Sequence, residues 1–237
     1  MTSFALKIIA IISMFCDHLG DSLMGHYSFL NLIGRIAFPI FAFQISEGFI
    51  HTKNIKKYFL RLGIFAIISQ IPFSLFVNKY LHASIFSLNV FFTLFLGLLS
   101  IYLYNYIEKR FKKLDKNNLQ KHYIDELIGF IIVLLIAYIA KLINTDYGFW
   151  GVIIVFIFYF FKKDKLAMII SFITLCTLRY GIQIIQGGYN TPTLLLGIFT
   201  TLSIIFISLY NGKQGKKIKY LLYFFYPIHL LLLYFIF

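Results

Sequence analysis

Long apolar runs alternate with short polar segments along nearly the whole chain of 237 residues. A helix that crosses the hydrocarbon of a bilayer needs roughly 20 mostly apolar residues, with about 17 to 25 common. Most of the runs have this length. The pattern therefore predicts an all-α, polytopic integral membrane helix bundle that forms a single domain over 1–237. Nine transmembrane helices are predicted, which span residues 4–24, 29–50, 58–78, 84–107, 125–143, 147–161, 165–187, 191–210 and 219–237.

Three details of this map matter for the count and for the shape of single spans. Segments 125–143 and 147–161 could form a broken or re-entrant pair across the sequence NTDYG, which would give eight spans instead of nine. We expect 4–24 to be retained as a first span rather than cleaved, because polar residues interrupt its apolar run. Pro39 removes a backbone hydrogen bond and should kink 29–50.

Positively charged residues occupy every second connection between the predicted spans. Cytoplasmic loops carry an excess of Lys and Arg, so we expect these connections in the cytoplasm, the N-terminus inside and the C-terminus outside. The other connections contain just Lys79 and Lys141, whereas Arg35 and Arg179 fall within apolar segments. The cytoplasmic set holds 18 of the 22 basic residues: Lys7, Lys53, Lys56, Lys57, Arg61, Lys109, Arg110, Lys112, Lys113, Lys116, Lys121, Lys162, Lys163, Lys165, Lys213, Lys216, Lys217 and Lys219.

Composition supports membrane insertion and argues against two other classes of protein. The chain is 60% hydrophobic and 13% charged, whereas a soluble domain is about half apolar and about a quarter charged. The net charge of +13 lies in short connections, so the expected partner is membrane lipid and not nucleic acid. Cys16 and Cys176 lie far apart in apolar runs and are expected to be buried thiols.

A group of five ionisable residues lies deep inside predicted spans, where such side chains usually face a partner or a cavity. A rise of about 1.5 Å per residue places His18 and Arg179 about 21 Å from the cytoplasmic side, and Arg35 about 9 Å from the outer side. Together with Asp17 and Asp21 they can share one polar cavity in the outer half. The spacing of Asp17, His18 and Asp21 allows a carboxylate to orient the imidazole as a general base. Alternatively, Asp–Arg pairs here only hold helices together.

Other polar residues at intermediate depth are candidates for contacts with a substrate. Gln70, Asn89 and Gln183 are each also explained by hydrogen bonds between helices. His229 lies about 15 Å into the last span, near the midplane, on the same helical rise. Asp146 lies in an outer turn, where it caps the next helix unless the turn folds over the polar cavity.

Several stretches in order along the chain resemble the TraX family of membrane proteins. They are LKIIAIISMFCDHLGD, IGRIAFPIFAFQISEGFIHTKNIKKYFLRL, AIISQIPFSLF, SLNVFFTLFLGLL, DYGFWGV, SLYNGKQGKKIKY and YFFYPIHLLLLY. The family is named for a protein that acetylates the N-terminus of pilin, and it looks like a branch of the transmembrane acyltransferases. The resemblance implies acetyl-CoA as the cytoplasmic donor and an acceptor at the outer face. It also implies His18 as the catalytic histidine with Arg35 as its companion, His26 being the alternative, and it matches His229 to a recurrent histidine.

These observations lead to one main functional hypothesis and two alternatives. An acetyl group would pass from acetyl-CoA to an amine or hydroxyl of a peptide or glycan, without a metal. His18 would act as general base or covalent acyl carrier, and Arg35 or Arg179 would stabilise the oxyanion or anchor an anionic group. The first alternative is a transporter with a solute or ion site at Asp17, Arg35 and Arg179. The second is a haem protein that uses His18 and His229, whose estimated depths differ by about 6 Å.

Overall fold

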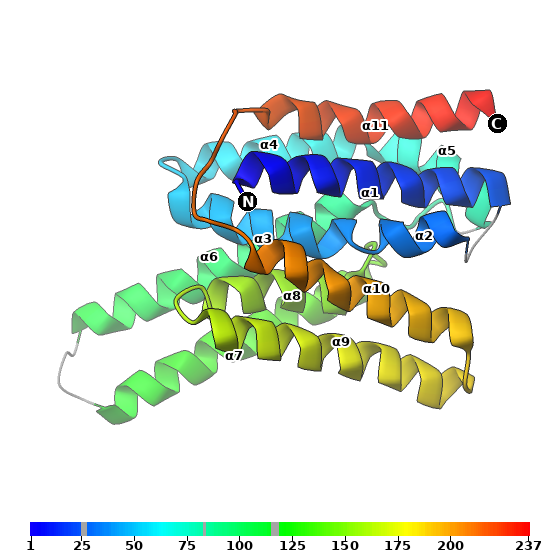
Figure 1. The fold of residues 1–237 in the computed structure, drawn as a ribbon. Coiled ribbons are helices and arrows are strands. Elements are labelled where there is room, and N and C mark those ends of the chain that lie inside the picture. Colours follow the sequence, from blue (N-terminus) through cyan, green and yellow to red (C-terminus); the bar gives the residue numbers. More distant parts are fainter. Residues whose placement is uncertain (25–27, 83, 115–118) are drawn as a thin grey trace.

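The computed structural model describes residues 1–24, 28–82, 84–114 and 119–237, and no β-strand forms in these ranges. The all-α prediction is therefore confirmed for the described residues. The helices, which Figure 1 labels, are α1 (Ser3–Met24), α2 (Phe29–Gly34), α3 (Ala37–His51), α4 (Ile55–Ile68), α5 (Gln70–Leu81), α6 (Val90–Leu114), α7 (Leu119–Leu142), α8 (Gly148–Phe160), α9 (Lys165–Gly187), α10 (Thr191–Ser208) and α11 (Lys219–Ile236).

Several of these helices are long and apolar enough to cross a membrane. Among the described residues, length and hydropathy identify five such spans: α1, α2 with α3, the first 21 residues of α6, α9 and α10. A sixth is counted if α4 and α5 form one bent span, and α8 and α11 are apolar but shorter. The chain thus has the helices of a membrane protein, whereas about nine spans and a cytoplasmic N-terminus remain predictions.

Two predicted spans are divided into two helices each. The break between α2 and α3 lies at Arg35 and Ile36, four and three residues before Pro39, whose missing N–H cannot bond to the carbonyl of Arg35. The break between α4 and α5 lies at Ser69, three residues before Pro72, and the two helices meet at 43°. At the place of the kink expected from Pro39, the helix is interrupted by a two-residue turn that contains Arg35, within a segment that counts as one span.

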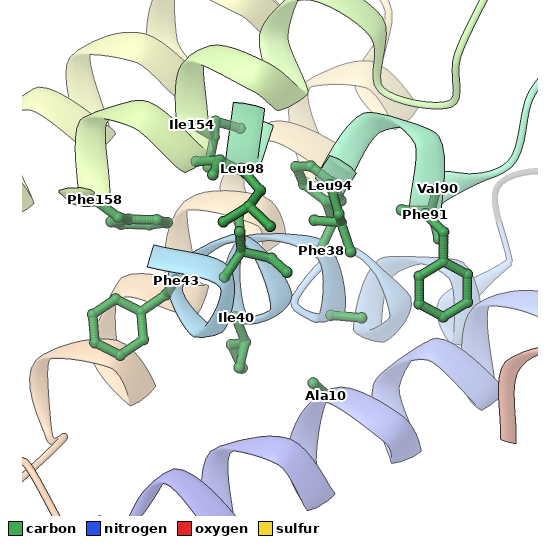
Figure 2. Packing of buried hydrophobic residues seen from close by; sticks show 14 of the residues in the cluster. Ala10, Phe38, Ile40, Phe43, Val90, Phe91, Leu94, Leu98, Ile154 and Phe158 are labelled. Carbon is green, nitrogen blue, oxygen red and sulfur yellow. The ribbon is translucent and has the colours of Figure 1, made fainter. Parts of the chain in front are cut away.

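Helix α3 lies at the centre of the bundle and contacts α1, α6, α8 and α10. In Figure 2, Ile40 of α3 points toward Ala10 of α1, while Leu98 of α6 and Ile154 of α8 gather on the other side of α3. All four side chains are almost completely buried. Helix α11 packs against α5 and α1, so the C-terminal helix covers the side of α1 that carries His18.

Three described connections that carry basic residues lie together at one end of the bundle, which we call the basic end. Figure 1 shows there the N-terminus and the connections α3–α4, α8–α9 and α10–α11, with the C-terminus at the opposite end. The connection α10–α11 pairs with the N-terminal residues through its backbone. The N–H groups of Ser3 and Phe4 donate to the carbonyls of Lys213 and Gln214 at 2.8 and 3.0 Å. A segment distant in sequence is thereby fixed to the start of α1.

Candidate functional site

An ion pair joins α1 to the α2–α3 turn at the place where the sequence predicts a polar cavity. Both oxygens of the Asp17 carboxylate accept hydrogen bonds from Nη2 of Arg35. The amide nitrogen Nδ2 of Asn31 donates to Oδ1 of Asp17 at 3.2 Å and to Oδ1 of Asp21 at 2.8 Å. The structure therefore brings Asp17, Asp21 and Arg35 together as expected. Asn31, which sequence reasoning missed, links the two carboxylates, and we call these four residues the α1–α2 cluster.

The close approach of α1 and α2 depends on a glycine. A Cβ atom on Gly34 would lie 2.3 Å from the Cβ atom of Asp17, a distance that non-bonded atoms do not adopt. Gly34 follows Asn31 by one helical turn, so it removes bulk beside the amide that bridges the carboxylates. The glycine therefore sets the separation of the two helices at the α1–α2 cluster.

Gly34→Ala should destabilise the protein by about 1–3 kcal/mol, because the added methyl group overpacks the helix contact at Asp17. Gly181→Ala is the matched control, since a Cβ atom there meets no atom within 4 Å and Gly181 is also helical. Thermal unfolding in nanodiscs should show a lower midpoint for Gly34→Ala alone. Equal midpoints for the two variants would contradict the role given to Gly34.

A second polar group lies at the turn between α7 and α8. Tyr147 has a φ of 62°, and its ring stacks on Phe38 with 3.8 Å between centroids. The guanidinium carbon of Arg179 lies 5.4 Å from the centroid of the Tyr147 ring, and its Nε and Nη1 atoms are buried without a hydrogen-bond partner among the described residues. Asp146 interacts electrostatically with both Arg35 and Arg179. The two arginines and Asp146 thus share one charged neighbourhood, and the turn folds toward it.

The two histidines of the predicted site contact each other directly. Nδ1 of His18 lies 2.7 Å from Nε2 of His229, and the rings stack with centroids 4.9 Å apart. His18 also packs against the rings of Phe76 and Tyr226, with centroids 5.3 and 6.1 Å away. The hydrogen bond expected between His18 and an aspartate is therefore replaced in the structure by one to His229. The difference of about 6 Å in depth estimated for the two histidines does not keep their rings apart.

This contact bears on the haem alternative. An ion held between two imidazole nitrogens requires them about 4 Å apart, at about 2 Å per bond. The 2.7 Å between Nδ1 of His18 and Nε2 of His229 leaves no room for an iron atom between those two nitrogens. These rings make a hydrogen-bonded pair rather than two axial ligands.

Three other candidates lie apart from this pair. Nδ2 of Asn89 donates to Oε1 of Gln70 at 2.9 Å and to the carbonyl of Ala66 at 2.7 Å, so both amides connect helices at the Ser69 break. Gln183 is exposed on α9. The alternative base His26 lies outside the described residues.

A cavity of about 590 Å³ lies at the basic end and extends inward between α1, α3, α4, α6 and α11. Its inner lining includes Met14, Phe91 and Tyr226, and the ring of Tyr226 packs edge-on against both His18 and His229. The guanidinium carbon of Arg61 lies 5.8 Å from the ring centroid of Tyr58, another residue of the lining. The Lys, Arg, Glu and His side chains of the lining are Lys7, Glu47, His51, Lys53, Arg61 and Lys217.

This cavity joins basic residues and apolar residues that sequence reasoning had assigned to different parts of the protein. Its outer part carries four Lys or Arg residues and a single carboxylate, and its inner part is aromatic and apolar. Arg61 and Tyr226 were missed as site residues, because Arg61 was assigned to membrane topology and Tyr226 to a span. An elongated ligand with an anionic end and an uncharged end would match both parts.

Comparison with known proteins places the chain in a family. The model of the TraX protein family matches residues 3–237. A probable fimbrial assembly protein, FimC of serogroup H1, from Dichelobacter nodosus is 29% identical, and the alignment covers 98% of this chain and 94% of that protein. An uncharacterized protein of Rickettsia prowazekii (strain Madrid E) is 23% identical over 98% of this chain and 90% of its own length. No solved structure matches. The chain belongs to the TraX family.

Proposed function

We propose that this protein is a plasma-membrane acetyltransferase that takes its acetyl group from cytoplasmic acetyl-CoA. The observation that carries the proposal is the cavity that runs from the basic end to Tyr226, beside the His18–His229 pair. Coenzyme A has anionic phosphates at one end and an uncharged thioester arm at the other. The basic part of the cavity suits the phosphates, and the apolar part suits the arm.

His18, which packs against the ring of Tyr226 at the inner end of this cavity, is the proposed general base. As the acceptor nitrogen or oxygen attacks the thioester carbonyl, His18 takes the proton from that atom. The new C–N or C–O bond forms, the C–S bond breaks, and the thiolate of CoA leaves with the electron pair and receives the proton from His18. The products are the acetylated acceptor and free CoA thiol, so the step needs no oxidant or metal.

Arg35 and Arg179 supply positive charge in the neighbourhood that they share with Asp146. The Arg35 guanidinium is held in place by Asp17, and Arg179 is held over the Tyr147 ring. Fixed cations stabilise an oxyanion better than mobile ones, because they need no reorganisation when charge develops. In this proposal one arginine stabilises the tetrahedral intermediate and the other binds an anionic group of the acceptor.

The acceptor is proposed to be a peptide at the outer face, with its amine or a hydroxyl as the reacting group. The support comes from a relative over almost the full length of both chains, which is named as a probable fimbrial assembly protein. A subunit of a surface fibre is therefore the first acceptor to test, ahead of an envelope glycan.

The proposal is tested with the full chain in nanodiscs supplied with acetyl-CoA. Release of CoA is followed by chromatography, with and without a synthetic peptide that carries a free N-terminus, and the peptide mass reports acetylation. Release of CoA above that of empty nanodiscs, increased by the peptide, would support the proposal. No release together with no binding of acetyl-CoA would reject it, and solute flux into sealed vesicles would then favour the transporter.

A further inference from the structure

His229 is buried on α11 with both ring nitrogens engaged, and only 3% of its surface is exposed. Its Nδ1 atom lies 2.7 Å from the carbonyl oxygen of Phe225, one turn earlier on the same helix. Its Nε2 atom lies 2.7 Å from Nδ1 of His18. The three groups form a chain of two hydrogen bonds that begins at a backbone carbonyl and ends at His18.

The carbonyl fixes where the protons lie in this chain. A carbonyl oxygen only accepts, so Nδ1 of His229 must carry the proton that it donates to Phe225. In a neutral imidazole the other nitrogen is then an acceptor, so Nδ1 of His18 donates to Nε2 of His229. His18 consequently has a proton on Nδ1 and an unprotonated Nε2 atom.

The surroundings of His229 favour this neutral arrangement. The rings that pack on it are Phe15, Phe225, Tyr226 and His18, and none of them supplies a negative charge. Placing a charged imidazole among such groups is costly unless a counter-charge compensates it. A charged His229 would instead donate its Nε2–H to Nδ1 of His18. A neutral His18 would then carry its own proton on Nε2, and that atom could not accept a proton from a substrate.

We infer that His229 is a positioning residue, which holds His18 in the tautomer whose Nε2 atom can accept a proton from the acceptor substrate. The inference rests on the proposed function, because it needs His18 as the base. The stacking of the two rings at an interplanar angle of 25° also fixes the plane of the His18 imidazole. His229 itself touches neither substrate, and it acts through the hydrogen bond to His18.

Two substitutions separate this role from simple packing. The amide of a glutamine at 229 reaches about as far along the side chain as Nε2 of histidine, so His229→Gln keeps an acceptor for His18. The amide of an asparagine is one carbon shorter, so His229→Asn resembles glutamine chemically but loses the hydrogen bond. For histidines that bind a metal, loss of such a hydrogen-bond partner lowers activity about 10- to 100-fold, and the same range is taken for His18. We expect that loss in kcat for His229→Asn and near wild-type kcat for His229→Gln.

The first readout is independent of turnover. Nitrogen-15 NMR of ring-labelled histidine in bilayers distinguishes the two neutral tautomers, and the signals that vanish in His18→Ala assign His18. Wild type and His229→Gln should show His18 protonated at Nδ1, and His229→Asn should show a shift toward protonation at Nε2. Wild-type His18 protonated at Nε2, or the same tautomer in both variants at 229, would overturn the inference even in an active enzyme.

The second readout separates the inference from the proposed function. The expected tautomer in a protein that turns over no acetyl-CoA would refute acyl transfer, and with it the catalytic role of His229, while the hydrogen bond would stand. An active enzyme with equal kcat for His229→Gln and His229→Asn would refute the positioning role alone. Thermal unfolding of both variants shows whether either substitution merely disrupts folding.

Discussion

His18→Ala should lower the rate of acetyl transfer by about 10²- to 10⁴-fold, the usual contribution of a positioned general base. Alanine removes Nε2 of His18, the one unprotonated ring nitrogen of the inferred His18–His229 pair that accepts no hydrogen bond within it. Binding of acetyl-CoA should change little, because the charged part of the cavity lies at the basic end, away from His18. The measurement is kcat and KM for CoA release by the full chain in nanodiscs.

His82→Asn is the matched control for this substitution. His82 is exposed at the end of α5 with a φ of 49°, a conformation that asparagine also adopts readily. This variant removes a histidine at the opposite end of α5 from the Ser69 break and should keep wild-type turnover. Full activity in His18→Ala, with His82→Asn also active, would exclude His18 as the base and move attention to His26.

Arg61→Glu should weaken binding of acetyl-CoA about 10- to 100-fold, since a hydrogen bond to a charged group contributes about 1.5–3 kcal/mol and about 1.4 kcal/mol is tenfold. Arg61 lies in the cavity lining with Lys7 and Lys53, so a carboxylate there would repel the phosphates and pair with the remaining cations. The measurement is the Kd for acetyl-CoA by equilibrium binding to nanodiscs, at low and at high salt.

Lys56→Glu makes the same change of charge on the same helix, but Lys56 is exposed and lies outside the cavity lining. Its effect should be small and should disappear at high salt, because exposed charges are screened. Equal weakening by Lys56→Glu and Arg61→Glu would mean that only the general positive charge of the basic end matters. Wild-type binding by Arg61→Glu would remove the cavity from the proposal.

The sequence predicted the helical segments and the meeting of Asp17, Asp21 and Arg35, because both depend on local signals. Apolar run length and Lys placement are properties of single segments, and buried charges in neighbouring spans have few partners to choose from. From the sequence, the interruption at Arg35 could be predicted only as a kink caused by Pro39. The structure replaces it with a turn, since the residues before Pro39 leave the helical hydrogen-bond pattern.

The contact between His18 and His229 could not be predicted in the same way. Depth counted from the start of a span assumes that every helix begins at the same level and runs straight along the membrane normal. Helix α11 begins at Lys219, as predicted, but its packing on α1 and α5 determines which side chains meet, and counted depth contains no information on packing. The cavity depends on five helices and two connections that are distant in sequence, and only their assembly showed that Arg61 and Tyr226 line one space.

The backbone pairing of Ser3 and Phe4 with Lys213 and Gln214 also determines how the protein should be prepared. Gln214 belongs to the cavity lining, and a Cβ atom on Gly215 would lie 2.9 Å from Oγ1 of Thr2. An affinity tag fused ahead of these residues would emerge beside the cavity mouth and compete with ligands for that space. A tag after Phe237 would emerge at the far end of the bundle (Figure 1), and purification by that route leaves the mouth of the cavity unobstructed.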